Sequence, residues 1–122
     1  MNYLVGATIF NIEGLAYGSK EVHIVTDKGT LRMYHAQDCC ECVCVEDVST
    51  NWKSFIGQTV LIAEERVNNK RDEEYQNSDT WTFYEIATKN DSMTIRWHGS
   101  SNGFYSESVD LKWMPLSNEQ VQ

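Results

Sequence analysis

Apolar and polar residues alternate with a period of two along most of this chain, a pattern that predicts half-buried β-strands. The alternating segments are residues 7–13, 21–26, 30–35, 39–46, 59–67, 80–88, 93–99 and 104–111. No strand–helix–strand alternation is present, so the pattern indicates a mainly β protein with about eight short strands in one antiparallel system. The sequence leaves open whether this system closes as a barrel or stacks as a sandwich.

Two turn signals predict hairpins between these strands. "DKG" separates residues 21–26 from 30–35, and Gly29 can take a positive φ there. "SSNG" separates 93–99 from 104–111, with Asn102-Gly103 as its turn. We therefore expect residues 93–111 to form a second hairpin.

One segment, residues 49–57, breaks the alternation and predicts one short helix. Ser49 or Thr50 can cap it, and Trp52, Phe55 and Ile56 would share one face. The most polar window, 68–79, is interpreted as a mobile loop. These assignments give one β-rich domain over residues 1–115 and a polar tail over 116–122.

The size and charge of the chain restrict its partners. At 122 residues it is long enough for one domain, and its net charge of −8 argues against binding to a nucleic-acid duplex. No apolar run is long enough to cross a bilayer, and the N-terminus lacks a basic signal region. We expect a cytoplasmic protein, in the cytosol of a host cell, whose thiols stay reduced.

All four cysteines lie in "YHAQDCCECVC", residues 34–44. Their spacing lacks the separated C-x₂-C pairs that zinc prefers, so we predict no metal and no cofactor. Cys40, Cys42 and Cys44 alternate, and we expect them to pack inward as small apolar side chains. A metal or thiol protein built on residues 39–44 remains as an alternative.

Three motifs together resemble a family of small phage and prophage proteins catalogued as a domain of unknown function. They are "YHAQDCCECVCVEDV", "WTFYEIAT" and "TIRWHGSSNGFYSESVD". The family pattern, as it matches this chain, contains His35, Asp38, Cys39, Cys40, Glu41, Glu46, Asp47, Trp81, Phe83, Tyr84, Arg96, Trp97, Ser101, Asn102, Gly103, Tyr105, Ser106 and Glu107. The resemblance implies a phage setting, in which small acidic proteins often act against host defences.

The third motif holds the densest candidate chemistry. In a hairpin, Arg96, His98, Tyr105 and Glu107 would meet on one sheet face. An Arg fork with aromatic planes suits a nucleotide-like ligand, although an ordinary Arg96–Glu107 cross-strand pair would also explain the pattern. The full set of candidate ligand-binding residues is Arg96, Trp97, His98, Asn102, Tyr105, Glu107, Trp81, His35, Asp38 and Glu41.

No catalytic motif is present, so we expect a protein that is not an enzyme. The favoured hypothesis is an anti-defence protein, expected to be a homo-oligomer, that sequesters a cyclic nucleotide or an ADP-ribose derivative. The alternative is an acidic inhibitor of a host nucleic-acid-binding defence protein. Its candidate contacts are Glu46, Asp47, Glu64, Glu65, Asp72, Glu73 and Glu74.

Overall fold

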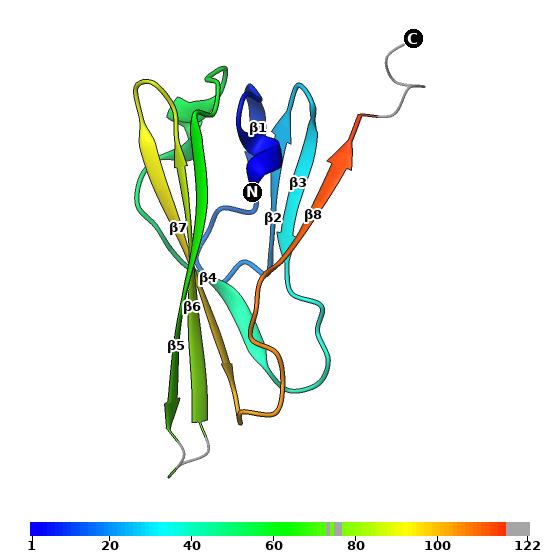
Figure 1. Ribbon diagram of the computed structural model, residues 1–122, viewed down its shortest axis with the longest axis vertical. Coiled ribbons are helices and arrows are strands. Elements are labelled where there is room, and N and C mark those ends of the chain that lie inside the picture. The colour runs from blue at the N-terminus through cyan, green and yellow to red at the C-terminus, as the bar shows by residue number, and fades with distance from the viewer. Residues whose placement is uncertain (73, 75–76, 117–122) are drawn as a thin grey trace.

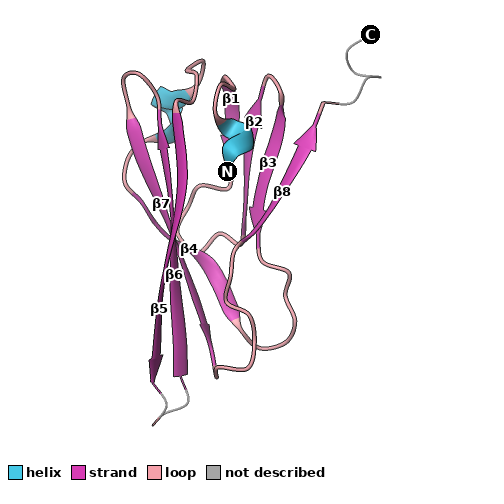
Figure 2. Ribbon diagram, viewed as in Figure 1, coloured by secondary structure: helices cyan, strands magenta, loops and turns pink. Residues whose placement is uncertain are grey.

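Eight strands form two four-stranded antiparallel sheets that face each other (Figures 1 and 2). The computed structural model describes residues 1–72, 74 and 77–116. The first sheet has the order β1 (Ile9–Glu13), β2 (Glu21–Thr26), β3 (Gly29–Tyr34) and β8 (Asp110–Pro115). The second has the order β4 (Cys42–Val48), β7 (Ser92–Ser101), β6 (Asn77–Ala87) and β5 (Ile62–Asp72). The mainly β prediction is confirmed, and of its two architectures the sandwich is the one adopted by the described residues.

The core lies between the upper parts of the two sheets, as Figure 1 is drawn. Alternate residues of β2, β3, β6 and β7 are buried, which is the expected result of the period-two pattern. The largest fully buried side chains are Trp97, Tyr84, Phe55, Leu4, Ile9, Ile24, Leu31 and Met33. The β2–β3 hairpin forms as predicted, with Gly29 at φ 153° and its carbonyl accepting a hydrogen bond from Thr26 Oγ1 at 2.7 Å.

The predicted helix is shorter than expected. Two 3₁₀ turns occur instead, η1 (Asn2–Leu4) and η2 (Trp52–Phe55). Asn51, rather than Ser49 or Thr50, caps η2, because its side-chain oxygen accepts a hydrogen bond from the Lys53 amide at 3.0 Å. Phe55 is fully buried.

The polar window 68–79 was wrongly interpreted as a loop. Strands β5 and β6 pair continuously from Ile62 opposite Ala87 to Asp72 opposite Asn77, so the described part of the window is a long hairpin. Polar residues can extend a strand here because backbone pairing needs no apolar side chain, and Asn69 also donates to Thr80 Oγ1 at 2.8 Å. Residues 73, 75 and 76 of the window, and residues 117–122 of the predicted tail, lie outside the described residues.

The second predicted hairpin is absent from the described chain. β7 pairs with β4 along one edge and with β6 along the other, so no edge is left for residues 104–111. The chain instead leaves β7 at Ser101 and crosses to the other sheet, where β8 pairs with β3. Tyr105 and Glu107 therefore lie in a connecting loop.

The expected inward packing of the cysteines is also wrong. Val43 and Val45 point into the core, whereas Cys42 is exposed and Cys44 is half-buried. Cys39 and Cys40 precede the strand and are joined by a disulfide, so they are not reduced. Glu41 is the first residue of this segment whose side chain points inward. Because side chains alternate along a strand, Val43 and Val45 then also point inward, and Cys42 and Cys44 point outward.

The described helical segments are only the two short 3₁₀ turns, and neither is long and apolar enough to cross a membrane.

Candidate functional site

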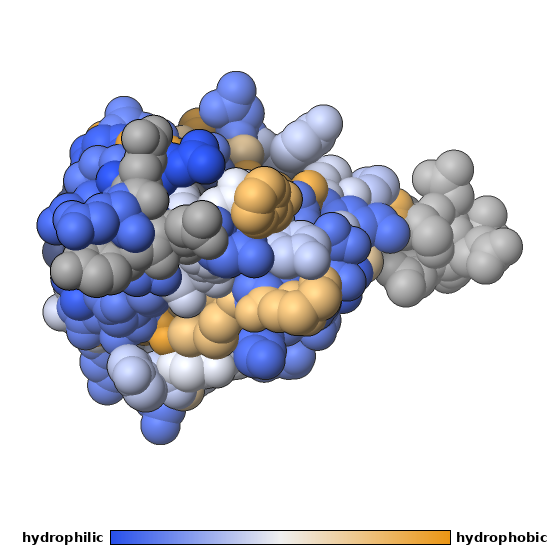
Figure 3. All heavy atoms as spheres, turned by 90° about the horizontal axis from the view of Figure 1, so that it is seen from below, coloured by the Kyte–Doolittle hydropathy of each residue, from blue (hydrophilic) through white to orange (hydrophobic). Residues whose placement is uncertain are grey.

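The lower half of the second sheet is faced by loops rather than by strands (Figures 1 and 2). One loop, residues 35–41, joins β3 to β4, and the other, residues 102–109, joins β7 to β8. Both loops belong to the motif segments selected from the sequence. Figure 3 looks onto this end of the molecule and shows mainly hydrophilic residues with a few separate hydrophobic ones. A polar end of this kind needs hydrogen bonds to hold its loops in place.

Glu107 anchors the second loop to the sheet. Its carboxylate accepts hydrogen bonds from Ser78 Oγ at 3.1 Å, from Thr80 Oγ1 at 2.8 Å and from Ser101 Oγ. Glu107 is buried, and a Cβ at Gly99 would lie 2.6 Å from its carbonyl oxygen. The loop therefore rests directly on β7, at a position where only glycine leaves room.

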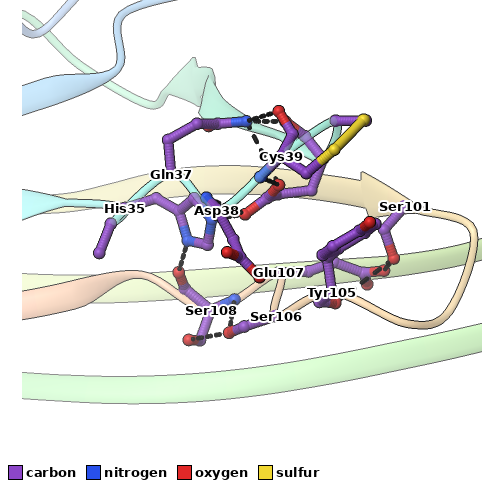
Figure 4. A network of polar contacts seen from close by, with 12 residues as sticks. His35, Gln37, Asp38, Cys39, Ser101, Tyr105, Ser106, Glu107 and Ser108 are labelled. Carbon is purple, nitrogen blue, oxygen red and sulfur yellow. Dashed lines mark hydrogen bonds and ion pairs between the residues drawn. A yellow bond between two sulfur atoms is a disulfide. The ribbon is translucent and has the colours of Figure 1, made fainter.

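Glu41 organises the first loop in a similar way (Figure 4). Its carboxylate accepts from the amides of Asp38 at 2.9 Å and Cys39 at 2.8 Å, and it contacts His35 Nε2 at 2.7 Å. The hydrogen bond from His35, followed by that from the Cys39 amide, lowers the pKa of Glu41 to about 2. Gln37 adds a donor to the backbone carbonyl of Glu41 at 2.6 Å.

His35 connects the two loops. Its Nδ1 lies 2.7 Å from the carbonyl oxygen of Ser108, while its Nε2 faces Glu41. Burial acts to lower the pKa of His35, but the hydrogen bonds to Glu41 and Ser108 outweigh it and raise that pKa. A ring with an acceptor at each nitrogen is best satisfied as an imidazolium, so His35 and Glu41 form a buried ion pair.

A pocket of about 380 Å³ opens beside these anchored loops. It is lined by Cys40, Asn77, Ser78, Asp79, Ser100, Ser101, Asn102 and Tyr105. Tyr105 is half-buried, and the Cys39–Cys40 disulfide lies near it in the close view (Figure 4). The lining offers hydroxyl and amide groups, one carboxylate and one aromatic ring, which suits a polar ligand with a flat part.

A cation lies close to the pocket at Arg71. A Cβ at Gly103 would lie 3.3 Å from Arg71 Nη2, so the guanidinium rests against the residue that follows Asn102. No carboxylate among the described residues forms an ion pair with Arg71. Arg71 therefore places one positive charge beside the pocket.

The outer face of the second sheet holds a separate cluster. Trp81 packs against the His98 ring with centroids 5.1 Å apart, and His98 Nε2 lies 2.9 Å from Asp79 Oδ1. Arg96 Nε lies 2.8 Å from Glu46 Oε1. Arg96 and His98 already have acidic partners, so the cluster resembles an ordinary ladder of surface pairs.

The sequence-predicted site residues therefore separate into several places. Trp97 is fully buried in the core and cannot contact a ligand, so its assignment is wrong. Arg96 and Glu107 lie on opposite faces of the sheet and do not pair, because residues 104–109 are a loop. Of the other candidates, Asn102 and Tyr105 line the pocket, while Trp81, Arg96 and His98 lie on the outer face of the sheet. His35, Glu41 and Glu107 are buried and hold the loops in place, and Asp38 is exposed.

Sequence reasoning missed six of the eight residues that line the pocket. They are Cys40, Asn77, Ser78, Asp79, Ser100 and Ser101, and Arg71 lies near them. Most of these residues fall in the polar window or turn signal that were assigned to loops. The sequence did contain a signal for this hairpin. Oppositely charged residues such as Lys70 and Asp79 lie opposite each other when the two halves of the window pair as strands.

Comparison with known proteins assigns a family to the chain. No curated protein and no solved structure matches it. One family model, described as Domain of unknown function (DUF7448), matches residues 2–111. This match covers β1 to β7, both motif-bearing loops and the first two residues of β8, and it confirms the expected domain of unknown function. The chain belongs to the DUF7448 family, a domain of unknown function.

Proposed function

We propose that this protein is a non-enzymatic binding protein that holds a small nucleotide-derived molecule in the pocket beside Tyr105. The observation that carries the proposal is the lining of that pocket, where hydroxyl and amide groups surround one aromatic ring. A volume of about 380 Å³ is near the lower end of the range of small-molecule sites, roughly 300–1,000 Å³. A ligand of mononucleotide size therefore fits better than a larger one.

Each part of such a ligand has a chemical counterpart in the pocket. Serine hydroxyls and the Asn77 and Asn102 amides can donate to and accept from ribose hydroxyls and base edges. Tyr105 offers a plane for stacking, which is worth about 1–3 kcal/mol per base. Arg71 supplies a fork for phosphate oxygens at the rim.

The two buried carboxylates near the pocket support binding without catalysis. Glu41 and Glu107 each accept three or more hydrogen bonds from the protein itself. A general base needs a lone pair directed at its substrate, whereas the lone pairs of these two carboxylates accept hydrogen bonds from the protein itself. Their role in the proposal is to fix the loops that carry Tyr105 and Asn102.

In a phage setting, the proposed ligand is an immune signal such as a cyclic nucleotide or an ADP-ribose derivative, of which a cyclic mononucleotide best fits the pocket volume, and the role is sequestration. The acidic-inhibitor alternative is less well supported by the sheet order. Glu46 and Asp47 lie on β4 and Glu64 and Glu65 on β5, which are opposite edges of one sheet. Two other strands, β7 and β6, therefore separate these two acidic pairs.

The proposal is tested by a thermal-shift screen of cyclic mononucleotides, cyclic dinucleotides and ADP-ribose derivatives, followed by calorimetry on any hit. Ribose and inorganic phosphate serve as fragment controls. A ligand at one hundred times its Kd should stabilise the fold by about 2.7 kcal/mol. Mass spectrometry of the released ligand should find it chemically unchanged.

Matched variants locate the binding site. Tyr105→Ala and Arg71→Ala should each weaken binding at least tenfold while leaving the apo melting temperature nearly unchanged. Tyr17→Ala removes a tyrosine that is 84% exposed and does not line the pocket, and this variant should bind normally. Ligand binding that is equally strong in all three variants, or no binding across the panel, would overturn the proposal.

A further inference from the structure

The four edge strands of the sandwich differ in how their free edges are protected. An unprotected edge presents unpaired N–H and C=O groups to other chains, so natural sheets block their edges with bulges, prolines or covering segments. β1 has a bulge between Ile9 and Asn11, and its Ile9 exchanges backbone hydrogen bonds with Gly57 and Gln58. This edge is therefore covered.

The edges of β4 and β8 are also protected. β4 has a bulge between Val45 and Asp47, and Val45 exchanges backbone hydrogen bonds with Gly18 and Ser19 at 2.8 Å each. β8 is only six residues long and ends at Pro115, which has no N–H to donate.

β5 is protected differently, by its charged side chains and by a contact with the short turn η1. It runs for eleven residues in unbroken register with β6, contains no proline, and has no strand along its other edge among the described residues. All of its residues except Ala63 are exposed, including Val67 at 60% and Ile62 at 45%. Figure 1 shows its lower part extending beyond the strands of the other sheet.

The sequence of β5 is complementary to itself in one antiparallel register. Two copies of β5 that pair antiparallel are related by a two-fold axis perpendicular to the sheet. Residues opposite each other in such a pair must lie on the same sheet face, so the axis must pass beside one residue rather than between two. With the axis at Val67, Glu64 of each copy lies opposite Lys70 of the other, and the two Val67 side chains meet. This register forms two oppositely charged pairs and one apolar contact.

The neighbouring registers are less favourable. An axis at Asn68 places Arg66 opposite Lys70, which repels. An axis at Arg66 places two arginines opposite each other. Of these three registers, the one with the axis at Val67 is the one that places no like charges opposite each other.

We infer that two copies of this chain pair through β5 with Val67 at the two-fold axis, joining their second sheets into one continuous eight-stranded sheet. The partner is a second copy because the complementarity is between β5 and itself. The inference uses no residue that lines the pocket at Tyr105, so it stands or fails independently of the proposed function.

Charge exchange tests the interface and its register. Sedimentation equilibrium should give a dimer for the natural chain. E64K and K70E should each place like charges opposite each other and raise the dimer dissociation constant at least tenfold. The E64K/K70E double variant restores opposite charges and should recover most of the affinity. Circular dichroism checks that every variant folds.

Crosslinking gives a second, independent measurement. In a C42S/C44S background, V67C should form a disulfide-linked dimer under mild oxidation, because the two substituted positions face each other. N68C, one residue further, should crosslink much more slowly. A natural chain that is monomeric at every concentration, a dimer that the three charge variants leave equally stable, or equal crosslinking of V67C and N68C would each overturn the inference.

Discussion

His35 Nε2 and Glu41 Oε2 lie 2.7 Å apart in a buried ion pair that joins the two ends of one loop. The side chains are 4% and 0% exposed. The same histidine contacts the Ser108 carbonyl, so this single ring also ties the 35–41 loop to the 102–109 loop. This pair holds the two loops together, so the free energy of unfolding of the whole domain should change as His35 and Glu41 titrate.

We expect stability to fall at both ends of the pH scale. The folded protein raises the pKa of His35 above 6.5, so its contribution is complete below that pH and is lost as pH rises through the raised pKa. The pKa of Glu41 is lowered from 4.5 to about 2, so its contribution is complete above 4.5 and is lost as pH falls toward 2. Urea unfolding midpoints measured across pH would show both limbs.

His35→Gln should be less stable at neutral pH and should lose the alkaline limb, since the titrating group is gone. His23→Gln is the matched control, because His23 is partly exposed and its ring lies only near surface carboxylates. An alkaline limb that survives in His35→Gln would contradict the assignment of that limb to this pair.

Glu107→Ala should destabilise the fold by roughly 1–3 kcal/mol, because the hydroxyls of Ser78, Thr80 and Ser101 would lose their shared acceptor in a buried site. Glu107→Gln keeps one acceptor oxygen and should cost less. Chemical denaturation measures both variants. Ser106→Ala, at an exposed position on the same loop, is the control and should be nearly neutral. A neutral Glu107→Ala would mean that the loop is held by other contacts.

Trp97→Ala should cost about 3–5 kcal/mol, because it leaves a large cavity between the sheets. Trp81→Ala should cost much less, since Trp81 lies on the outer face against His98 and is partly exposed. Urea unfolding followed by circular dichroism compares the two without relying on tryptophan fluorescence. Similar losses for the two variants would contradict the placement of Trp97 in the core and Trp81 outside it.

Two thiols should react with a disulfide reagent in the folded, unreduced protein, and four after denaturation with reductant, because Cys39 and Cys40 form a disulfide. Cys42 is exposed and should react first. Cys44 should react more slowly, since burial, together with the neighbouring Cys42, raises the pKa of its thiol. Loss of the fast phase in Cys42→Ser identifies it. Four thiols reacting without reductant would show that the disulfide is absent.

The sequence by itself determined the strand content, the β2–β3 hairpin and the buried face of most strands. These features follow from local pattern, because alternation decides which side chains face inward and Gly29 permits the turn. The motifs that carry the family resemblance also include residues 35–41 and 101–108. The structure places both segments at one end of the sandwich, where they contact each other through His35 and Ser108.

Only the tertiary structure decided where the third motif goes after β7. The Asn102-Gly103 signal is compatible with a hairpin, but β4 and β6 occupy both edges of β7, and the chain must cross to the other sheet. The frame of the cysteines is set by the loop that precedes β4, where the amides of Asp38 and Cys39 donate to the Glu41 carboxylate and Glu41 is buried. The occupancy of the sheet edges and the contact of His35 with Ser108 depend on segments distant in the sequence, and no local pattern contains that information.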